Sequence, residues 1–229
     1  MQRINLHQRG ITGLETAIIL IAFVVVASVF AFTVLSTGIF SSERSKETVF
    51  SGIEEAQSTL EPRGSMIAFS ANVDGSTSTV FKLIFLVANA IAGEPVDLTP
   101  GYTANDSGTD PDVDSTAKQI TVISYRDKDQ FLPDVPWTVS YPGDDDGDNL
   151  LENNEKAEIT VWLLNRDFGV ANVSSADSAT VMSSRGITSA ADAPLVNDEF
   201  TIEVKPPSGA VLNLRRTFPS QFDTVIDLN

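Results

Sequence analysis

The chain has 229 residues, with 15 basic against 31 acidic residues and a formal net charge of −16. Nucleic acid binds basic surfaces and would repel such a polyanion, so we expect no nucleic-acid partner. The chain has no cysteine and one histidine, His7, which argues against a disulfide framework, thiol catalysis and a histidine-ligated zinc site. The composition therefore favours a protein that is not an enzyme.

A long apolar segment follows the first ten residues. Between Glu15 and Glu43 lie 27 residues without a charge. As a helix they would be about 40 Å long, enough to cross a bilayer. The segment is apolar on every side, so it requires lipid or other helices around it. After Phe40 the pattern becomes amphipathic, and Pro62 and Gly64 are expected to end it, which predicts one helix over 11–61.

From residue 65 onward the pattern is typical of strands. Seven segments rich in β-branched and aromatic residues are separated by turn residues: 65–73, 78–92, 118–127, 135–141, 156–165, 199–206 and 210–218. They predict an antiparallel, Ig-like β-sandwich over 65–229, so that the fold class is α+β. Two polar stretches, Pro95 to Ser115 and Asn165 to Asn197, are expected to be exposed inserts. They contain the N-glycosylation sequons that begin at Asn105 and Asn172, which are predicted to carry N-glycans unless they occur by chance.

An acidic stretch from Asp144 to Glu155 fits the spacing of a calcium loop. Counting from Asp144, carboxylates fall at places 1, 3, 5, 9 and 12 and a backbone carbonyl at place 7 of the twelve-residue template: Asp144, Asp146, Asp148, Glu152 and Glu155, with Leu150. Place 6 departs from the template because Asn149 replaces glycine, although asparagine also tolerates a left-handed turn. The alternative is a solvated acidic turn. Because five neighbouring carboxylates repel one another, we predict a structural Ca²⁺ here.

The junction Arg9-Gly10-Ile11 lies before the apolar run, whereas a secretory signal peptide is cut after its apolar region. Glu15 follows as the fifth residue after Gly10. This order of basic leader, glycine, apolar residue, glutamate and unbroken helix, carried by Gln8 to Phe23, resembles the archaeal flagellins, or archaellins, and more distantly type IV pilins. The expected β-sandwich and the lack of cysteine favour an archaellin over a bacterial pilin. Glu15 also suits a plain first-turn carboxylate that the helix dipole favours.

The resemblance implies a complete life cycle. A prepilin-type peptidase would remove residues 1–10 and leave 13 basic against 31 acidic residues, a formal charge of −18. The precursor would be held in the cytoplasmic membrane. An assembly ATPase and a membrane platform would then build an extracellular helical homopolymer, with or without related archaellins, that serves motility. Two alternatives remain at this stage: an adhesive archaeal type IV pilin, and a membrane-anchored extracellular binding module that does not polymerise.

Overall fold

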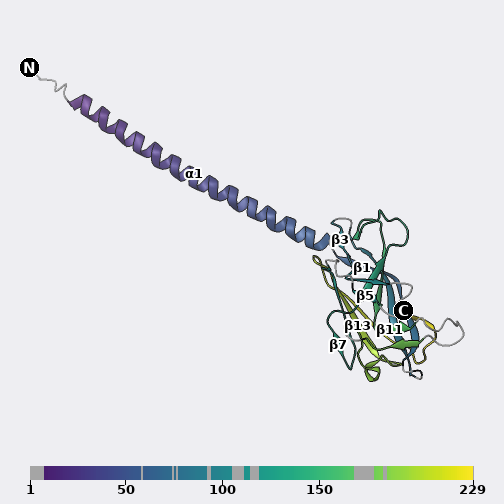
Figure 1. Ribbon diagram of the computed structural model, residues 1–229. Helices are drawn as coiled ribbons and strands as arrows, with labels where there is room; N and C mark the ends of the chain where they lie inside the picture. Colours follow the sequence, from purple (N-terminus) through teal and green to yellow (C-terminus); the bar gives the residue numbers. More distant parts are fainter. Residues whose placement is uncertain are drawn as a thin grey trace, which may run out of the picture. The chain divides into compact units, whose positions relative to one another are not determined.

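The computed structural model describes residues 8–57, 59–73, 75, 77–91, 94–104, 111–113, 119–167, 178–182 and 185–228. The chain divides into two compact units, Met1–Gly52 and Ile53–Asn229. The first consists of most of one helix, and the second is built from β-strands (Figure 1).

The helix α1 spans Gln8–Gln57 and is continuous over 50 residues. Its apolar stretch lacks proline, so nothing interrupts the backbone hydrogen bonds. The helix ends at Gln57, slightly before the expected end near residue 61, and Pro62 and Gly64 lie in the following strand instead. At the other end, residues 8–10 of the predicted leader are helical in the uncleaved chain.

The larger sheet has seven strands in the order β11-β12-β1-β2-β10-β8, with β15 also pairing to β1. Their bounds are β1 Leu60–Val73, β2 Thr77–Asn89, β8 Trp137–Ser140, β10 Ala157–Trp162, β11 Asn165–Asp167, β12 Ser178–Thr180 and β15 Val225–Leu228. All pairs are antiparallel except β1 with β12, which is parallel. The register of β1 and β2 shifts between Arg63 and Ile67 and again after Phe69. The first shift lets Gly64, with a φ of 81°, sit within the strand, while Pro62 lies just before it, opposite Val87.

The smaller sheet has four strands in the order β14-β13-β6-β7. Their bounds are β6 Val122–Arg126, β7 Phe131–Leu132, β13 Glu199–Lys205 and β14 Leu212–Thr217. Two short ribbons pair β3 (Val96–Asp97) with β9 (Leu150–Leu151), and β4 (Tyr102–Ala104) with β5 (Pro111–Val113). A short 3₁₀ helix, η1, covers Ala190–Asp192.

One hydrophobic core joins the two sheets. Leu83, Phe85 and Ile159 of the larger sheet are buried in the same cluster as Tyr125 and Ile202 of the smaller sheet. Most strands supply alternate residues to this cluster, as expected when each sheet buries one face, although β2 and β10 also contribute the consecutive pairs Val80–Phe81 and Val161–Trp162. The predicted fold class, a long apolar helix followed by an antiparallel β-sandwich, is therefore confirmed.

The two polar inserts differ from the prediction of exposed connections. In the first, Leu98 and Tyr102 are fully buried, and in the second Met182 and Ile187 are buried. The backbone of the second insert is also fixed, because the N–H of Met182 donates to the Ile187 carbonyl at 2.8 Å. Single apolar residues in a polar stretch produce no periodic signal, yet each fills space in the core. The sequon residues Asn105 and Asn172 lie outside the described residues.

Candidate functional site

The side chains of α1 from Leu14 to Phe40 form a continuous, exposed apolar surface. Phe32, for example, is 73% exposed and Val26 is 68% exposed. The segment Gly13–Ile53 is long and apolar enough to cross a membrane. A surface of this size is not stable in water, so it must be covered by lipid or by other protein surfaces.

Hydroxyl side chains within the apolar surface form hydrogen bonds with their own helix. Thr16 donates to the Gly13 carbonyl at 3.0 Å and Ser28 to the Val25 carbonyl at 2.9 Å. Thr33 donates to the Val29 carbonyl at 2.8 Å. These bonds meet the donor requirement of the hydroxyls without water, so the residues are compatible with an apolar environment.

The second part of α1 is amphipathic. Arg44 forms an ion pair with Glu47 at 3.0 Å, and its guanidinium lies 5.5 Å from the centroid of the Phe40 ring. Val49, Phe50 and Ile53 remain exposed. We call residues 43–57 the amphipathic segment. Over residues 43–53 it presents charged residues beside this exposed apolar side.

The predicted processing residues lie at the start of α1. Arg9, Gly10 and Ile11 belong to its first turns, and Glu15 follows one turn later with its side chain exposed. A helical junction offers its peptide bonds less readily than an extended one. The predicted cleavage between Gly10 and Ile11 would therefore require the first turns to open, which glycine favours because it destabilises a helix interior.

The acidic loop connects β8 to β10 and is held by neighbouring strands. The amide of Leu98 donates to the Asn149 carbonyl, and Asn89 Nδ2 donates to the Leu151 carbonyl, both at 2.9 Å. Within the loop, Gly143 and Gly147 adopt positive φ values of 109° and 94°. These glycines permit two tight turns that a residue with a side chain would resist.

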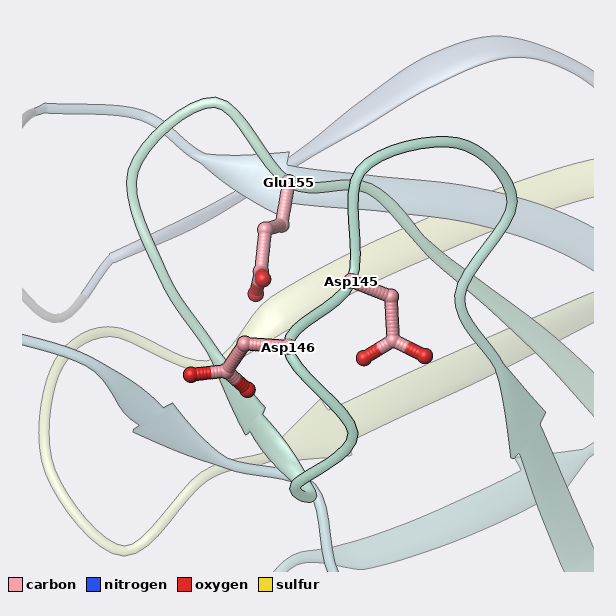
Figure 2. Close-up of side chains that lie close together, drawn as sticks. All are labelled: Asp145, Asp146 and Glu155. Atoms are coloured by element: carbon pink, nitrogen blue, oxygen red, sulfur yellow. The ribbon is translucent and has the colours of Figure 1, made fainter.

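The loop brings three carboxylates together. Oxygen atoms of Asp145, Asp146 and Glu155 all lie within 4.8 Å of one another. Figure 2 shows the Glu155 side chain extending toward the two aspartates from the opposite limb of the loop. Glu155 is 9% exposed, and one of its oxygens accepts the amide N–H of Glu152 at 2.9 Å. Carboxylate oxygens are the donors that calcium prefers, so this group fits a hard divalent cation.

This group overlaps only partly with the predicted ligand set. Asp146 and Glu155 belong to both, whereas Asp144, Asp148 and Glu152 are exposed and outside the group. The carboxylate of Asp148 instead accepts the amide N–H of Leu150 at 2.7 Å, and Leu150 lies in the short strand β9. Asp145 was not predicted, because the calcium-loop template assigns no ligand to the second place.

A partly buried tyrosine, Tyr141, lies near the acidic group. The hydroxyl of Tyr141 is buried without a hydrogen-bond partner in the described structure. Burial raises the pKa of Tyr141 well above its ordinary value, and the negative charges of Glu155, Asp148 and Asp145 raise it further. This tyrosine therefore stays protonated at neutral pH.

Comparisons with known proteins cover nearly the whole chain. The family model for archaeal-type flagellins matches residues 10–216. Probable flagellin 2 of Archaeoglobus fulgidus is 32% identical, over 96% of this chain and 95% of that protein. Probable flagellin 1 of Aeropyrum pernix is 31% identical, over 95% of this chain and 96% of that protein. The archaeal flagellum of Methanospirillum hungatei has a similar fold, with a TM-score of 0.53 and 22% identity over 94% of this chain and 98% of the other. The chain belongs to the archaeal-type flagellin family.

Proposed function

We propose that this structural subunit of the archaeal motility filament polymerises through α1. The observation that carries the proposal is the exposed apolar surface of α1 from Leu14 to Phe40. Lipid would cover this surface before assembly, and helices of other subunits would cover it afterwards. Because apolar side chains replace lipid tails with similar dispersion contacts, the transfer need not expose the helix to water. The β-sandwiches then lie outside this filament core.

The proposed life cycle requires other proteins. A prepilin-type peptidase removes residues 1–10 from a precursor anchored in the cytoplasmic membrane, and an assembly ATPase and a membrane platform add subunits to the growing filament. The contacts repeat without closing, which produces a helical polymer of this chain or of this chain with related archaellins. The sequence contains no phosphate-binding GxxxxGK[ST] motif, so the energy for assembly and rotation comes from these partners. The chain itself acts as a structural protein and not as an enzyme.

Intact mass and N-terminal sequencing of purified filaments test the processing step. We expect the mature subunit to begin at Ile11, and a subunit that begins at Met1 or after residue 40 would contradict the proposal. Gly10→Val is expected to leave uncleaved precursor in the membrane, because the branched side chain crowds the scissile bond. Gly13→Val is the matched control, since an added Cβ there meets no atom within 4 Å, and it should be cleaved normally.

We further propose that the acidic loop binds calcium through Asp145, Asp146 and Glu155. Three carboxylates so close together repel one another, and a divalent cation removes that repulsion while water completes its coordination. The role is structural: the ion would tie the limb that follows β8 to the limb that precedes β10. This set replaces the six-residue set expected from the calcium-loop template.

N-glycans at Asn105 and Asn172 are also proposed. Both asparagines begin an N-x-Ser sequon in a polar stretch of the chain. Glycans attached there would add hydrophilic bulk to the outer domain of the filament. Mass spectrometry of peptides from purified filaments would detect them, and unmodified peptides at both positions would refute the proposal.

A further inference from the structure

The strand β2 is apolar on both faces, although only one face contributes to the sandwich core. Residues 83–88 read LIFLVA without interruption. Leu83, Phe85 and Val87 are fully buried in the core, while Ile84 and Leu86 alternate with them and are half-buried on the opposite face. A continuous apolar run is typical of a strand that is covered on both sides.

The strand register extends this second apolar surface over three strands. Ile67 of β1 lies opposite Ile84 of β2, and Phe69 of β1 lies opposite Val225 of β15. Val225 is 53% exposed. We call Ile67, Ile84, Leu86 and Val225 the outer apolar face; Phe69, at its edge, packs against Phe81 of the core cluster.

Polar contacts confirm which side of the sheet this is. On β10, Trp162 Nε1 donates to Thr138 Oγ1 of β8 at 3.2 Å, so Trp162 and Thr138 share one face. On that same face Lys82, opposite both Phe69 and Trp162, places its ammonium 4.5 Å from the Phe69 ring centroid and 5.3 Å from that of Trp162. Leu83 follows Lys82 on β2 and Val161 precedes Trp162 on β10. Because successive side chains of a strand point to opposite faces, Leu83 and Val161 point into the core.

The outer side of the smaller sheet is polar by comparison. Its outward residues alternate with the buried ones along β13 and β14: Glu199, Thr201, Glu203, Lys205, Asn213 and Arg215. A sandwich exposed to water on both sides would have polar residues on both outer faces. The contrast within one domain therefore marks the larger sheet as the side that is covered in the assembled state.

We propose that the outer apolar face binds the amphipathic segment of α1 from a second copy of this chain. The proposal rests on polymerisation through α1, which places this segment of neighbouring subunits just beyond the filament core. Val49, Phe50 and Ile53 lie on one side of the helix, at the spacing that allows a helix to pack on a sheet, and they lack cover of their own.

The dimensions of the two surfaces agree. From β15 across β1 to β2 the outer apolar face extends over two strand spacings, about 9 to 10 Å. On β10 the residues opposite Ile84 and Leu86 are the polar Thr160 and Glu158. The amphipathic segment is about 22 Å long as a helix, so it can cross all three apolar strands. This contact covers two apolar surfaces at once and links the outer domain of one subunit to the helix of another.

Cross-linking between introduced cysteines tests the contact, because the natural chain contains none. Filaments are prepared from the double variant Phe50→Cys with Leu86→Cys and treated with a short bismaleimide. We expect covalent dimers and longer multimers. The matched control, Phe50→Cys with Asn213→Cys, places the second cysteine at an exposed position on the smaller sheet and should remain monomeric.

Three outcomes of this experiment would overturn the inference: monomers from the first double variant, equal multimers from both, or a link within one chain identified by peptide mapping. A second variant tests the same contact without a cross-linking reagent, in case the bismaleimide cannot reach the two cysteines. Leu86→Glu should lower the temperature at which filaments dissociate while leaving the thermal unfolding of the detergent-solubilised full chain unchanged. Filaments of unaltered stability would also overturn the inference. In both experiments, wild-type filaments that form normally would leave the proposal of polymerisation through α1 standing, even if the contact with the outer apolar face is refuted.

Discussion

A charge in the middle of α1 provides the most direct test of the filament core. Val26 lies near the centre of the 27 residues without a charge, and its side chain is 68% exposed in the single chain. If helices of other subunits cover it, Val26→Asp forfeits the burial of the valine side chain, about 1.5 kcal/mol. The new carboxylate adds about 3 kcal/mol by the cost of placing aspartate at the centre of an apolar span.

The two contributions total about 4 to 5 kcal/mol for each subunit, which corresponds to roughly a thousand-fold weaker association. The cost recurs at every subunit, so we expect almost no filaments. Part of the precursor should still reach the membrane, because lipid lets water and headgroups approach the new carboxylate, whereas packed helices in the filament core exclude them.

The assay measures the subunit separately in the membrane fraction and in filaments sheared from cells. Val26→Leu is the apolar control, and Asn213→Asp adds the same charge to an exposed position of the β-sandwich; both should yield filaments in normal amounts. Normal filaments from Val26→Asp would refute the assignment of α1 to the filament core. Loss of the variant from both fractions would indicate failed insertion, in which case Val26→Thr, with a smaller penalty, replaces it in the same comparison.

Three further predictions concern the β-sandwich. Calcium should raise the melting temperature of the chain, and Asp146→Ala combined with Glu155→Ala should remove most of that rise, whereas Asp148→Ala should not; scanning calorimetry with and without calcium measures both. Leu98→Ala should lower the free energy of unfolding by about 2 to 5 kcal/mol in denaturant titrations, because Leu98 is fully buried. A loss below about 1 kcal/mol would contradict this burial. All three tyrosines have a raised pKa, with burial as the first cause. Their contribution to the stability of the folded chain is therefore complete below about pH 10, where the unfolded tyrosines titrate, and is lost as the pH rises through the pKa values of the folded chain. Tyrosinate absorbance should appear together with unfolding, and its appearance near pH 10 in the folded chain would contradict the burial of Tyr125.

The long elements were predictable because each of them carries a repeated pattern. Twenty-seven residues without a charge and without proline specify a helix in any apolar environment. The strands β1, β2, β10 and β13 have enough apolar and β-branched residues to be identified by composition alone. The end of α1 was less predictable, because Pro62 and Gly64 fit equally well after a helix or in an irregular strand. In the structure these residues belong to β1, which pairs with β2.

The short elements and the acidic site were not predictable in the same way. Strands of two or three residues, such as β3 and β9, have no period, and they form because tertiary contacts bring Leu98 and Leu151 into the core. In the acidic loop, a linear template assigned ligands by their order along the chain. The turns at Gly143 and Gly147 instead determine which carboxylates meet, and they bring in Asp145 and leave out Asp148.

The internally bonded hydroxyls of α1 affect the precursor before any filament exists. In a bilayer, serine and threonine commonly join helices by hydrogen bonds between them. Thr16, Ser28 and Thr33 have already donated their protons to their own backbone, so they provide little polar adhesion between precursors that meet by diffusion. If the precursor is held in the membrane as proposed, its subunits would therefore remain dispersed there, and the proposed assembly machinery would set the site and timing of filament growth.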